Sequence, residues 1–224
     1  GLRGLCLQLD LRGVWLAAIA SGLVMSAYVG RRLLLKVSGV MVAGLGSLIV
    51  ISHAFRDRVM SIFDLGFRSN ADRLVLWKTN FKIWLDYPLL GVGTGENERV
   101  IVDYYQRAGM EGYQGHAHNN LIQFLSGNGV LGLTCFLIFA VGFFVISHRL
   151  WRRIPVEHWF ERSLVLGVMG AQVALQVGGM TECNFKDAEV NHLFLFLLAV
   201  IFVLNQKYQL GQNGASLQSA EGQI

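Results

Sequence analysis

The sequence is poor in charge, in proline and in cysteine. Only 15% of its 224 residues are charged, whereas a soluble domain usually carries about 25%. There are two prolines and three cysteines. Cys6, Cys135 and Cys183 show no CxxC or other metal-ligand spacing, so they do not indicate a cysteine metal centre. The net charge of +4 comes without a basic stripe and interleaved aromatics, so the sequence does not indicate a nucleic-acid partner.

Apolar residues make up 53% of the chain instead. A membrane-spanning helix needs about 20 mostly apolar residues, and several segments approach that length. The 26 glycines fit the same class of protein, because glycine is tolerated in membrane spans and lets helices pack closely. The predicted spans are residues 13–30, 33–52, 119–147, 163–181 and 188–205.

The fold class that follows is all-α. We predict a polytopic transmembrane helical bundle with about five spans and one large, partly helical loop at residues 53–118. Residues 1–210 are assigned to a single transmembrane domain. Residues 211–224 lack apolar periodicity, so we predict a disordered tail there. The chain starts without a methionine or a signal-peptide pattern, and we expect further spans upstream.

The distribution of basic residues predicts how the spans are oriented. Short loops rich in Lys and Arg favour the cytoplasm. The connector after the first span, the connector after the third span and the end of the fifth span are all basic, which agrees with alternating spans. The opposite face, the periplasm in a bacterium, then receives the loop at 53–118. The basic residues are Arg31, Arg32, Lys36, Arg149, Arg152, Arg153 and Lys207.

Part of the large loop has a helical pattern. Leu74, Trp77, Phe81 and Trp84 recur at spacings of three and four, which predicts one apolar helix face. The helix is expected to end before Pro88. The glycines that follow, in "GVGTG", allow a tight backbone path. They come without a preceding strand and do not indicate a nucleotide-binding fold.

Three side chains are predicted to meet at the outer membrane boundary. Arg12 and His118 lie at outer ends of spans, and Arg73 lies in the loop on the same face. An arginine offers a permanent charge and a planar fork that suits phosphate oxygens, and a neutral histidine can accept a proton near neutral pH. Asn119 and Asn120 are good helix caps for the span that follows, whose N-terminus favours anions. The combination indicates a site for an anionic, lipid-linked substrate with a base beside it.

Each candidate also has a structural interpretation. Arg12 can be an anchor at a span end. Arg73 can pair with Asp72 or stack on Trp77, and His118 can be an interfacial polar residue or a cap. The carboxylates of the last outer loop are interpreted mainly as solvated charges, with assistance to His118 as the alternative. These are Glu182, Asp187 and Glu189.

A metal site is a further interpretation of "HAH". His116 and His118 offer two imidazole ligands, but a metal needs more than two. The other candidate ligands are scattered along the sequence, so we predict no metal. They are Glu98, Asp103, Glu111 and His192.

The stretch that begins at His118 matches a pattern of known proteins. The pattern is His, then Asn, Ser or Gln, then nine residues, Gly, two residues, and Gly, Thr or Tyr. His118, Asn119, Gly129 and Gly132 occupy its defined positions. In this respect the chain resembles the bacterial O-antigen ligase family, whose superfamily also includes O-antigen polymerases and O-linked oligosaccharyltransferases.

Two further segments are similar to that family. "LRGVWLA" at 11–17 resembles a Ser-Arg-Gly sequence where a span begins, with Leu11 in place of the serine. "DRLVLWKTNFKIWLDYPLLGVGTG" at 72–95 resembles the family's loop signature of an arginine, a tryptophan helix and Pro-Leu-Leu-Gly. The resemblance covers most of this chain and corresponds to the C-terminal part of a family member.

The resemblance implies a metal-independent, inverting glycosyltransferase of the GT-C type that needs no cofactor. The implied donor is a glycan on undecaprenyl diphosphate, and the implied acceptor is a lipid A–core sugar hydroxyl, another glycan or a protein. Carried onto this sequence, Arg12 and Arg73 would bind the diphosphate and stabilise the leaving charge, with Asn119 beside them in the substrate site. His118 would be the general base. The implied location is the bacterial inner membrane, with the site facing the periplasm.

Other functions are kept open. A polymerase or a protein-glycosylating enzyme would use the same scaffold with a different acceptor. A non-catalytic transporter or assembly subunit is the alternative of another class. Transporters usually carry ionisable residues in the middle of their spans, whereas the polar groups here collect at one face, which favours chemistry at a membrane surface.

Overall fold

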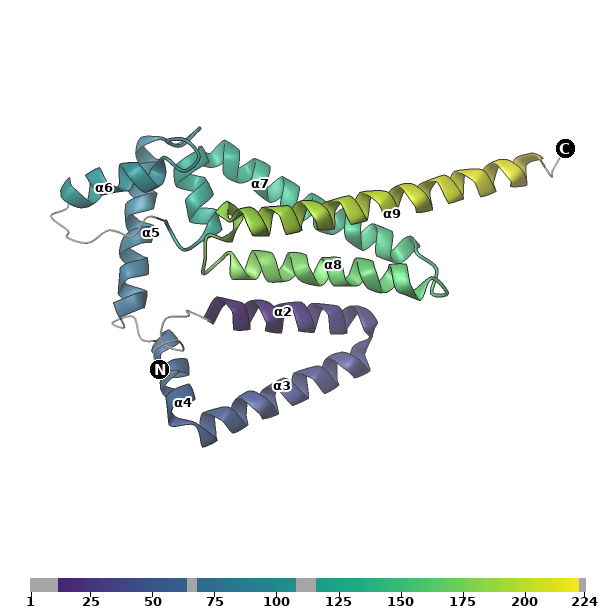
Figure 1. Cartoon of the computed structure of the whole chain (residues 1–224), viewed down its shortest axis with the longest axis horizontal. Coiled ribbons are helices and arrows are strands. Elements are labelled where there is room, and N and C mark those ends of the chain that lie inside the picture. Colours follow the sequence, from purple (N-terminus) through teal and green to yellow (C-terminus); the bar gives the residue numbers. More distant parts are fainter. Residues whose placement is uncertain (1–11, 64–67, 108–115, 222–224) are drawn as a thin grey trace.

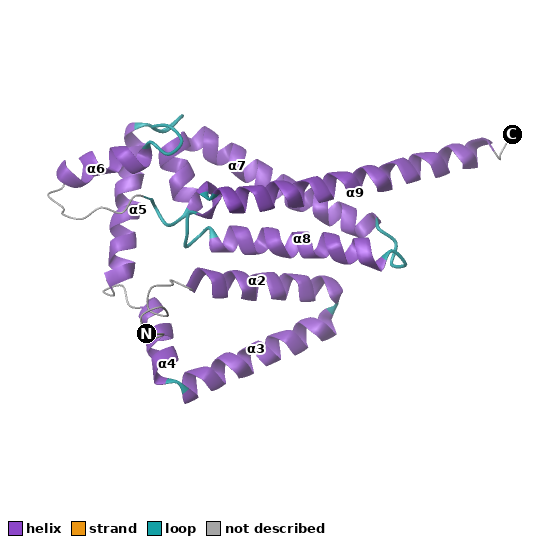
Figure 2. Ribbon diagram, in the orientation of Figure 1, coloured by secondary structure: helices purple, strands orange, loops and turns teal. Residues whose placement is uncertain are grey.

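The computed structural model describes residues 12–63, 68–107 and 116–221, and in these ranges the chain is helical with no strand (Figure 2). The side chains of Arg12, Arg58, 62–63, 68–70 and 210–221 lie outside the description. The helices are α2 (Arg12–Val29), α3 (Arg31–Ile51), α4 (His53–Phe63), α5 (Arg68–Asp86), α6 (Asn97–Arg107), α7 (Asn120–Arg153), α8 (Trp159–Gly178), the short 3-10 helix η1 (Asn184–Lys186) and α9 (Ala188–Glu221).

The apolar runs form helices at the predicted positions. Three helices of the described part are long and apolar enough to cross a membrane: α3, α7 and α9 as far as Gln209, with mean hydropathies of 2.1, 2.6 and 1.9. Gly13–Val29 within α2 is a shorter apolar helix, and α8 occupies the place of the fourth predicted span. The all-α, polytopic membrane fold is therefore confirmed, whereas the number of five crossings stays a prediction.

The bundle is formed by α2, α7, α8 and α9. Figure 1 shows α2 lying along α8, and α7 and α9 lying beside α8. Large apolar side chains of α7, α8 and α9 fill the core between them; those buried include Phe143, Leu150, Val165, Met169, Phe194 and Ile201. On the other side of α8, glycine permits the close approach of α2. A Cβ on Gly170 would lie 2.4 Å from the Met25 sulfur.

Helix α7 is broken at Gly129, which has φ 65° and ψ −168°. The turn that follows α5 packs into this break. The N–H groups of Val130 and Leu131 donate to the carbonyls of Pro88 and Leu89, at 2.9 and 3.2 Å. A Cβ on Gly129 would lie 2.2 Å from the Leu89 carbonyl oxygen. The broken helix thus exchanges hydrogen bonds with the "PLLGVG" turn, which explains why glycine occupies this position.

Glycines of the turn complete this junction. Val92 and Gly93 donate their N–H groups to the carbonyls of Ser126 and Gly127, at 3.1 and 2.7 Å. Gly91 has φ 64°, and a Cβ on it would lie 2.4 Å from the Gly127 carbonyl carbon. The "GVGTG" stretch therefore serves as a close-packed backbone clamp on α7.

The predicted apolar face of the loop helix is wrong in detail. Helix α5 forms as expected and ends before Pro88, but the predicted apolar face is not the face that α5 buries, and Phe81 of that predicted face is 49% exposed. The residues that α5 buries against α6 and α7 are instead Leu76, Thr79, Asn80 and Ile83. This face includes two polar side chains whose hydrogen bonds are made inside the protein, so a search for apolar residues alone selects the neighbouring face.

Helix α9 extends through Glu221, so the backbone from Gly211 is helical where the sequence predicted a disordered tail. Apolar residues are few beyond Gln209, but no proline follows Pro155 to end the helix.

Candidate functional site

His118 lies in a short segment that leads into α7, and two side chains hold the backbone of the preceding residue, Ala117. The Trp77 indole N–H of α5 donates to the Ala117 carbonyl at 2.8 Å. The Ala117 N–H donates to the Gln123 side-chain oxygen at 3.0 Å. His118 itself has φ 47°, a left-handed conformation that is uncommon outside glycine. These contacts and this conformation fix the direction of the imidazole at the start of the helix.

Asn119 and Asn120 both hydrogen-bond neighbouring parts of the chain. Asn119 is the N-cap of α7, and its side-chain oxygen accepts the Ile122 N–H at 3.1 Å. Its amide N–H donates to the Met180 carbonyl at 2.9 Å. The Asn120 amide donates to the Asn184 side-chain oxygen at 2.6 Å. Capping by Asn119 is thereby confirmed, and both residues tie α7 to the loop between α8 and α9.

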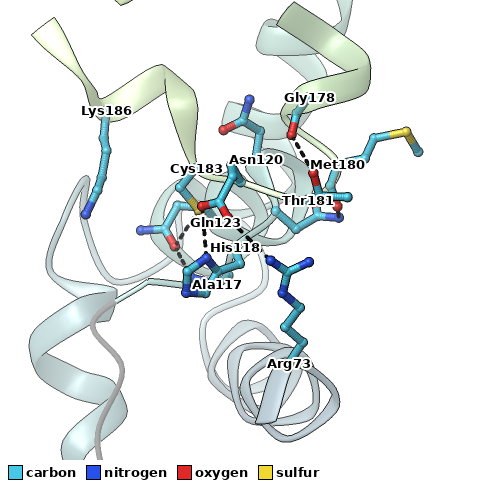
Figure 3. Close-up of polar contacts among 12 residues, drawn as sticks. Arg73, Ala117, His118, Asn120, Gln123, Gly178, Met180, Thr181, Cys183 and Lys186 are labelled. Carbon is cyan, nitrogen blue, oxygen red and sulfur yellow. Dashed lines mark hydrogen bonds and ion pairs between the residues drawn. The ribbon is translucent and has the colours of Figure 1, made fainter. Parts of the chain in front are cut away.

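That loop brings Glu182 to His118 and Arg73. His118 Nδ1 lies 2.9 Å from Glu182 Oε2, and an Arg73 guanidinium nitrogen lies 3.3 Å from Glu182 Oε1. Figure 3 shows Arg73 reaching from α5 toward the loop that carries Thr181 and Cys183, with His118 beside it. Two of the three predicted site residues are thus joined by a third side chain.

Glu182 was interpreted mainly as a solvated loop charge; its side chain is 41% exposed, and it also contacts His118, as the alternative interpretation requires. Asp187 and Glu189 of the same loop are exposed, as expected. Burial raises the pKa of Glu182, but the hydrogen bond with His118 and the charges of His118 and Arg73 lower it more, so the pKa is below its ordinary value. Glu182 is therefore a carboxylate at neutral pH. A carboxylate only accepts hydrogen bonds, so neutral His118 donates through Nδ1 and keeps the lone pair on Nε2.

His116 packs against this group. Its ring centroid lies 4.1 Å from that of His118, and one ligand atom from each of His116, His118 and Glu182 lies within 4.8 Å of the others. Burial lowers the pKa of His116, and the charges of His118 and Lys186 lower it further. Asp103 and His192 belong to no such group in the described part of the chain, and Glu111 lies outside the described residues.

Arg12, the third predicted residue, is the first residue of α2, and its side chain lies outside the described part of the structure. Its neighbour Gly13 is described. A Cβ on Gly13 would lie 1.9 Å from the Thr181 hydroxyl oxygen and 3.7 Å from the Gly178 carbonyl oxygen. The start of α2 therefore borders the loop that carries Glu182.

A cavity of about 510 Å³ opens beside the group. Its polar lining includes His116, Glu182 and Lys186, and its apolar lining includes Ala17 of α2 and Leu175 of α8. Cys183 also lines it, and burial raises the pKa of its thiol to about 11, so it is no thiolate nucleophile. The cavity is thus amphipathic: charged groups lie where the helices end and small apolar residues lie along the helices.

Sequence reasoning named Glu182 only as an alternative partner of His118, and it missed Gln123 as a support. The Glu182 contact joins segments that only the fold brings together, since Glu182 is 64 positions from His118; the Gln123 side chain accepts from the Ala117 N–H, which is 6 positions away. The available signal was topological, because the loop around Glu182 was predicted on the same face as His118.

A sequence model of the O-antigen ligase family matches residues 5–137, which is more than half of the chain. This chain belongs to the O-antigen ligase family. No curated protein matches it. Members of the O-antigen ligase family are glycosyltransferase-like enzymes, and the family implies glycan and lipid-linked substrates and membrane lipids as partners. The matched segment contains Arg12, Arg73 and His118, whereas Glu182 lies beyond it.

Proposed function

We propose that this chain transfers a glycan from undecaprenyl diphosphate to a sugar hydroxyl of lipid A–core at the periplasmic face of the bacterial inner membrane. The observation that carries the proposal is the line of contacts from Arg73 through Glu182 to His118 at the edge of an amphipathic cavity. A cation for a diphosphate, an oriented base and an apolar surface for a prenyl chain are the groups that such a transfer needs.

His118 is the proposed general base. With Nδ1 donating to Glu182, Nε2 takes the proton of the acceptor hydroxyl as its oxygen attacks the anomeric carbon. The bond between that carbon and the diphosphate oxygen breaks in the same step, which inverts the configuration. Glu182 stabilises the imidazolium that forms and orients the ring, so it is a positioning residue. General base catalysis of this kind contributes about 10²- to 10⁴-fold.

Arg73 and Arg12 are proposed to bind the diphosphate. The Arg73 side chain is 14% exposed and emerges beside the group. A guanidinium carries five N–H donors, enough to hold Glu182 and phosphate oxygens together. Charge on the leaving diphosphate increases in the transition state, so a fixed cation there lowers the barrier without a metal. Asn119, the capping residue, is proposed to border the substrate site through its position next to His118.

The orientation is supported by the basic turns. The α2–α3 and α7–α8 connections lie at the end of the bundle away from the α7 N-terminus (Figure 1). Arg31 and Arg32 are in the first connection, and Arg152 and Arg153 end α7. Short basic loops favour the cytoplasm, so His118 is proposed to face the periplasm.

The test is His118→Ala in the source organism, with His158→Ala as the matched control. His158 is exposed and lies at the other end of α8. We expect His118→Ala to abolish glycan transfer while the protein remains at its normal level in the membrane fraction. Transfer that persists in His118→Ala would remove the proposed base.

The same strains identify the acceptor when lipopolysaccharide and glycoproteins are examined together. Polymer missing from lipid A–core but present on the carrier lipid means a ligase. Single repeats on the core mean a polymerase, and unglycosylated proteins mean a protein O-oligosaccharyltransferase. Unchanged glycans in all three pools would favour a transporter or assembly subunit.

A further inference from the structure

His116 is a half-buried histidine whose position the proposed transfer does not explain. Its Nδ1 is buried and, among the described residues, makes no hydrogen bond. A buried nitrogen without a partner costs free energy, and its presence in a native structure calls for an explanation such as an ion. The ring faces His118 at 4.1 Å between centroids and lines the cavity together with Glu182.

Three groups that bind metals are therefore already assembled. One ligand atom from each of His116, His118 and Glu182 lies within 4.8 Å of the other two. Zinc at its usual bond lengths separates tetrahedral ligands by about 3.4 Å. His118 Nδ1 and Glu182 Oε2 are 2.9 Å apart, and no two of the three ligand atoms are more than 4.8 Å apart, so side-chain shifts of about 1.5 Å bring them to zinc spacing.

We propose that His116, His118 and Glu182 form a site for a borderline divalent transition metal such as zinc, and that the bound metal inhibits glycan transfer. The metal takes no part in the metal-free reaction proposed above but shares His118 and Glu182 with it, and the inhibitory part of this proposal rests on that reaction. Two imidazoles and one carboxylate are a ligand set that zinc accepts, with a fourth position open to the cavity.

The inhibition follows from the chemistry of the imidazole. A metal on Nε2 of His118 occupies the lone pair that would take the acceptor proton. A metal on Nδ1 leaves the ring proton on Nε2, which then has no lone pair to offer. Either mode of coordination removes the base. The metal would also occupy the end of the cavity that Glu182 lines, where the donor is proposed to bind.

Neighbouring cations limit the affinity and make the site reversible. The Arg73 contact uses Oε1 of Glu182, and Oε2 faces His118, so one oxygen can bind the ion while the other keeps its arginine. Lys186 also lines the cavity, but Glu98 lies 3.1 Å from its ammonium and neutralises part of its charge. A positive guanidinium next to a divalent ion is unfavourable, so we expect weaker binding than at a closed structural zinc site.

Cobalt binding tests the site without any transfer assay. The purified full chain, in detergent and treated with chelator, is titrated with Co²⁺, whose visible absorption reports coordination by nitrogen and oxygen; zinc is then added as competitor. His116→Gln removes one ligand, and His158→Gln is the control histidine. Outer-shell partners alone affect affinity about 10- to 100-fold, so loss of a direct ligand is expected to weaken binding by at least about 100-fold.

The transfer assay then tests inhibition. Zinc is expected to reduce transfer by the unsubstituted protein, and chelator is expected to restore it. The control variant His158→Gln should respond to zinc and chelator in the same way. Any residual transfer by His116→Gln should resist zinc. No cobalt signal, or an equal signal in His116→Gln, overturns the site. Activation by zinc, or loss of activity with chelator, overturns the inhibitory role. Absence of any transfer contradicts the proposed function and leaves the cobalt titration as an independent result.

Discussion

Helix α3 and the first turns of α7 show two ways of using a membrane-length helix. None of the 21 residues of α3 is buried in the described structure, and they are mostly apolar, as lipid contact requires. The first turns of α7 bury Asn120, Ser126, Gly127 and Gly129. The apolar composition of α3 is therefore enough to explain its position in the membrane, whereas the position of the first turns of α7 depends on contacts with specific residues.

The polar partners of α7 come from two other helices. The Ser126 hydroxyl lies 2.7 Å from the Asn80 side-chain oxygen of α5, and the Asn97 amide of α6 donates to the Ser126 hydroxyl at 2.9 Å. The Gln123 amide donates to the Asn97 side-chain oxygen at 3.1 Å. Gln123 in turn holds the backbone next to His118. Satisfied buried polar networks specify one arrangement, so the network positions the candidate base.

The largest expected effect comes from Gly129→Ala. Its backbone conformation is essentially restricted to glycine, and a Cβ would lie 2.2 Å from the Leu89 carbonyl oxygen. Strain and overpacking together are expected to cost about 3 to 5 kcal/mol. Thermal unfolding in detergent measures this. Gly142→Ala in the same helix is the control, because a Cβ there meets nothing within 4 Å. Equal melting temperatures for the two variants would contradict the clamp between α7 and the turn.

The second prediction concerns Glu182→Gln. The amide keeps the shape of the side chain but loses the charge that orients His118 and stabilises its protonated form, so kcat is expected to fall about 10- to 100-fold. A merely structural role would not shift the pH dependence of kcat, which is measured alongside. Glu189→Gln, an exposed carboxylate that begins α9, should leave kcat unchanged. Equal kcat values for both variants would exclude the positioning role.

The contact between Glu182 and His118 is also expected to make the stability of the protein depend on pH. The folded-state pKa of Glu182 is below its ordinary value of 4.5. Its contacts therefore stabilise the protein above pH 4.5, and this contribution is lost as the pH falls through the lowered pKa. The difference in melting temperature between the unsubstituted protein and Glu182→Gln should be present at neutral pH and decline in acid. A difference that grows in acid would contradict the assignment.

The helix positions could be predicted from the sequence, whereas several side-chain contacts could not. The lengths of apolar runs predict helix positions, because a span in lipid has to satisfy its backbone N–H and C=O groups by hydrogen bonds within the helix. The helices lie where expected. The buried face of α5 was not predictable in this way, because Asn80 and Thr79 are buried with polar partners. Arg73 and His118 were found by chemistry and topology. Glu182 was named as a possible partner of His118 but was not among the predicted site residues. The two residues are 64 positions apart, and only the packing of the chain shows which distant side chains meet.

Arg73→Lys is expected to have a smaller effect than Glu182→Gln. Lysine keeps the charge but loses the planar fork, so a single ammonium nitrogen has to serve both Glu182 and the diphosphate. We expect kcat/KM for the lipid-linked donor to fall about tenfold, measured with purified donor and acceptor. Arg99→Lys is the control, because Arg99 is 83% exposed and pairs with Glu96. A fully active Arg73→Lys would indicate that Arg73 acts only in packing.

Ser126→Ala compares the buried network with its exposed counterpart. The hydroxyl bridges Asn80 and Asn97, but these two already lie 3.3 Å apart and can remain paired without it. The expected loss is therefore about 1 kcal/mol of unfolding free energy. Ser47→Ala on α3 removes a hydroxyl that donates to the Ala43 carbonyl of its own helix, and its effect is expected to be below about 0.5 kcal/mol. Equal losses would show that the network does not depend on the hydroxyl.

The smallest effect is expected at Val40, in the middle of α3. The side chain is 72% exposed in the described structure, so Val40→Ala leaves no cavity and exchanges one apolar surface for another. We expect a change below about 0.5 kcal/mol in unfolding free energy, measured in bicelles. Ile83→Ala on α5, which is fully buried against α6, is the contrasting variant and should lose about 2 to 5 kcal/mol. A Val40→Ala loss close to that of Ile83→Ala would mean that α3 packs against protein rather than lipid in the membrane.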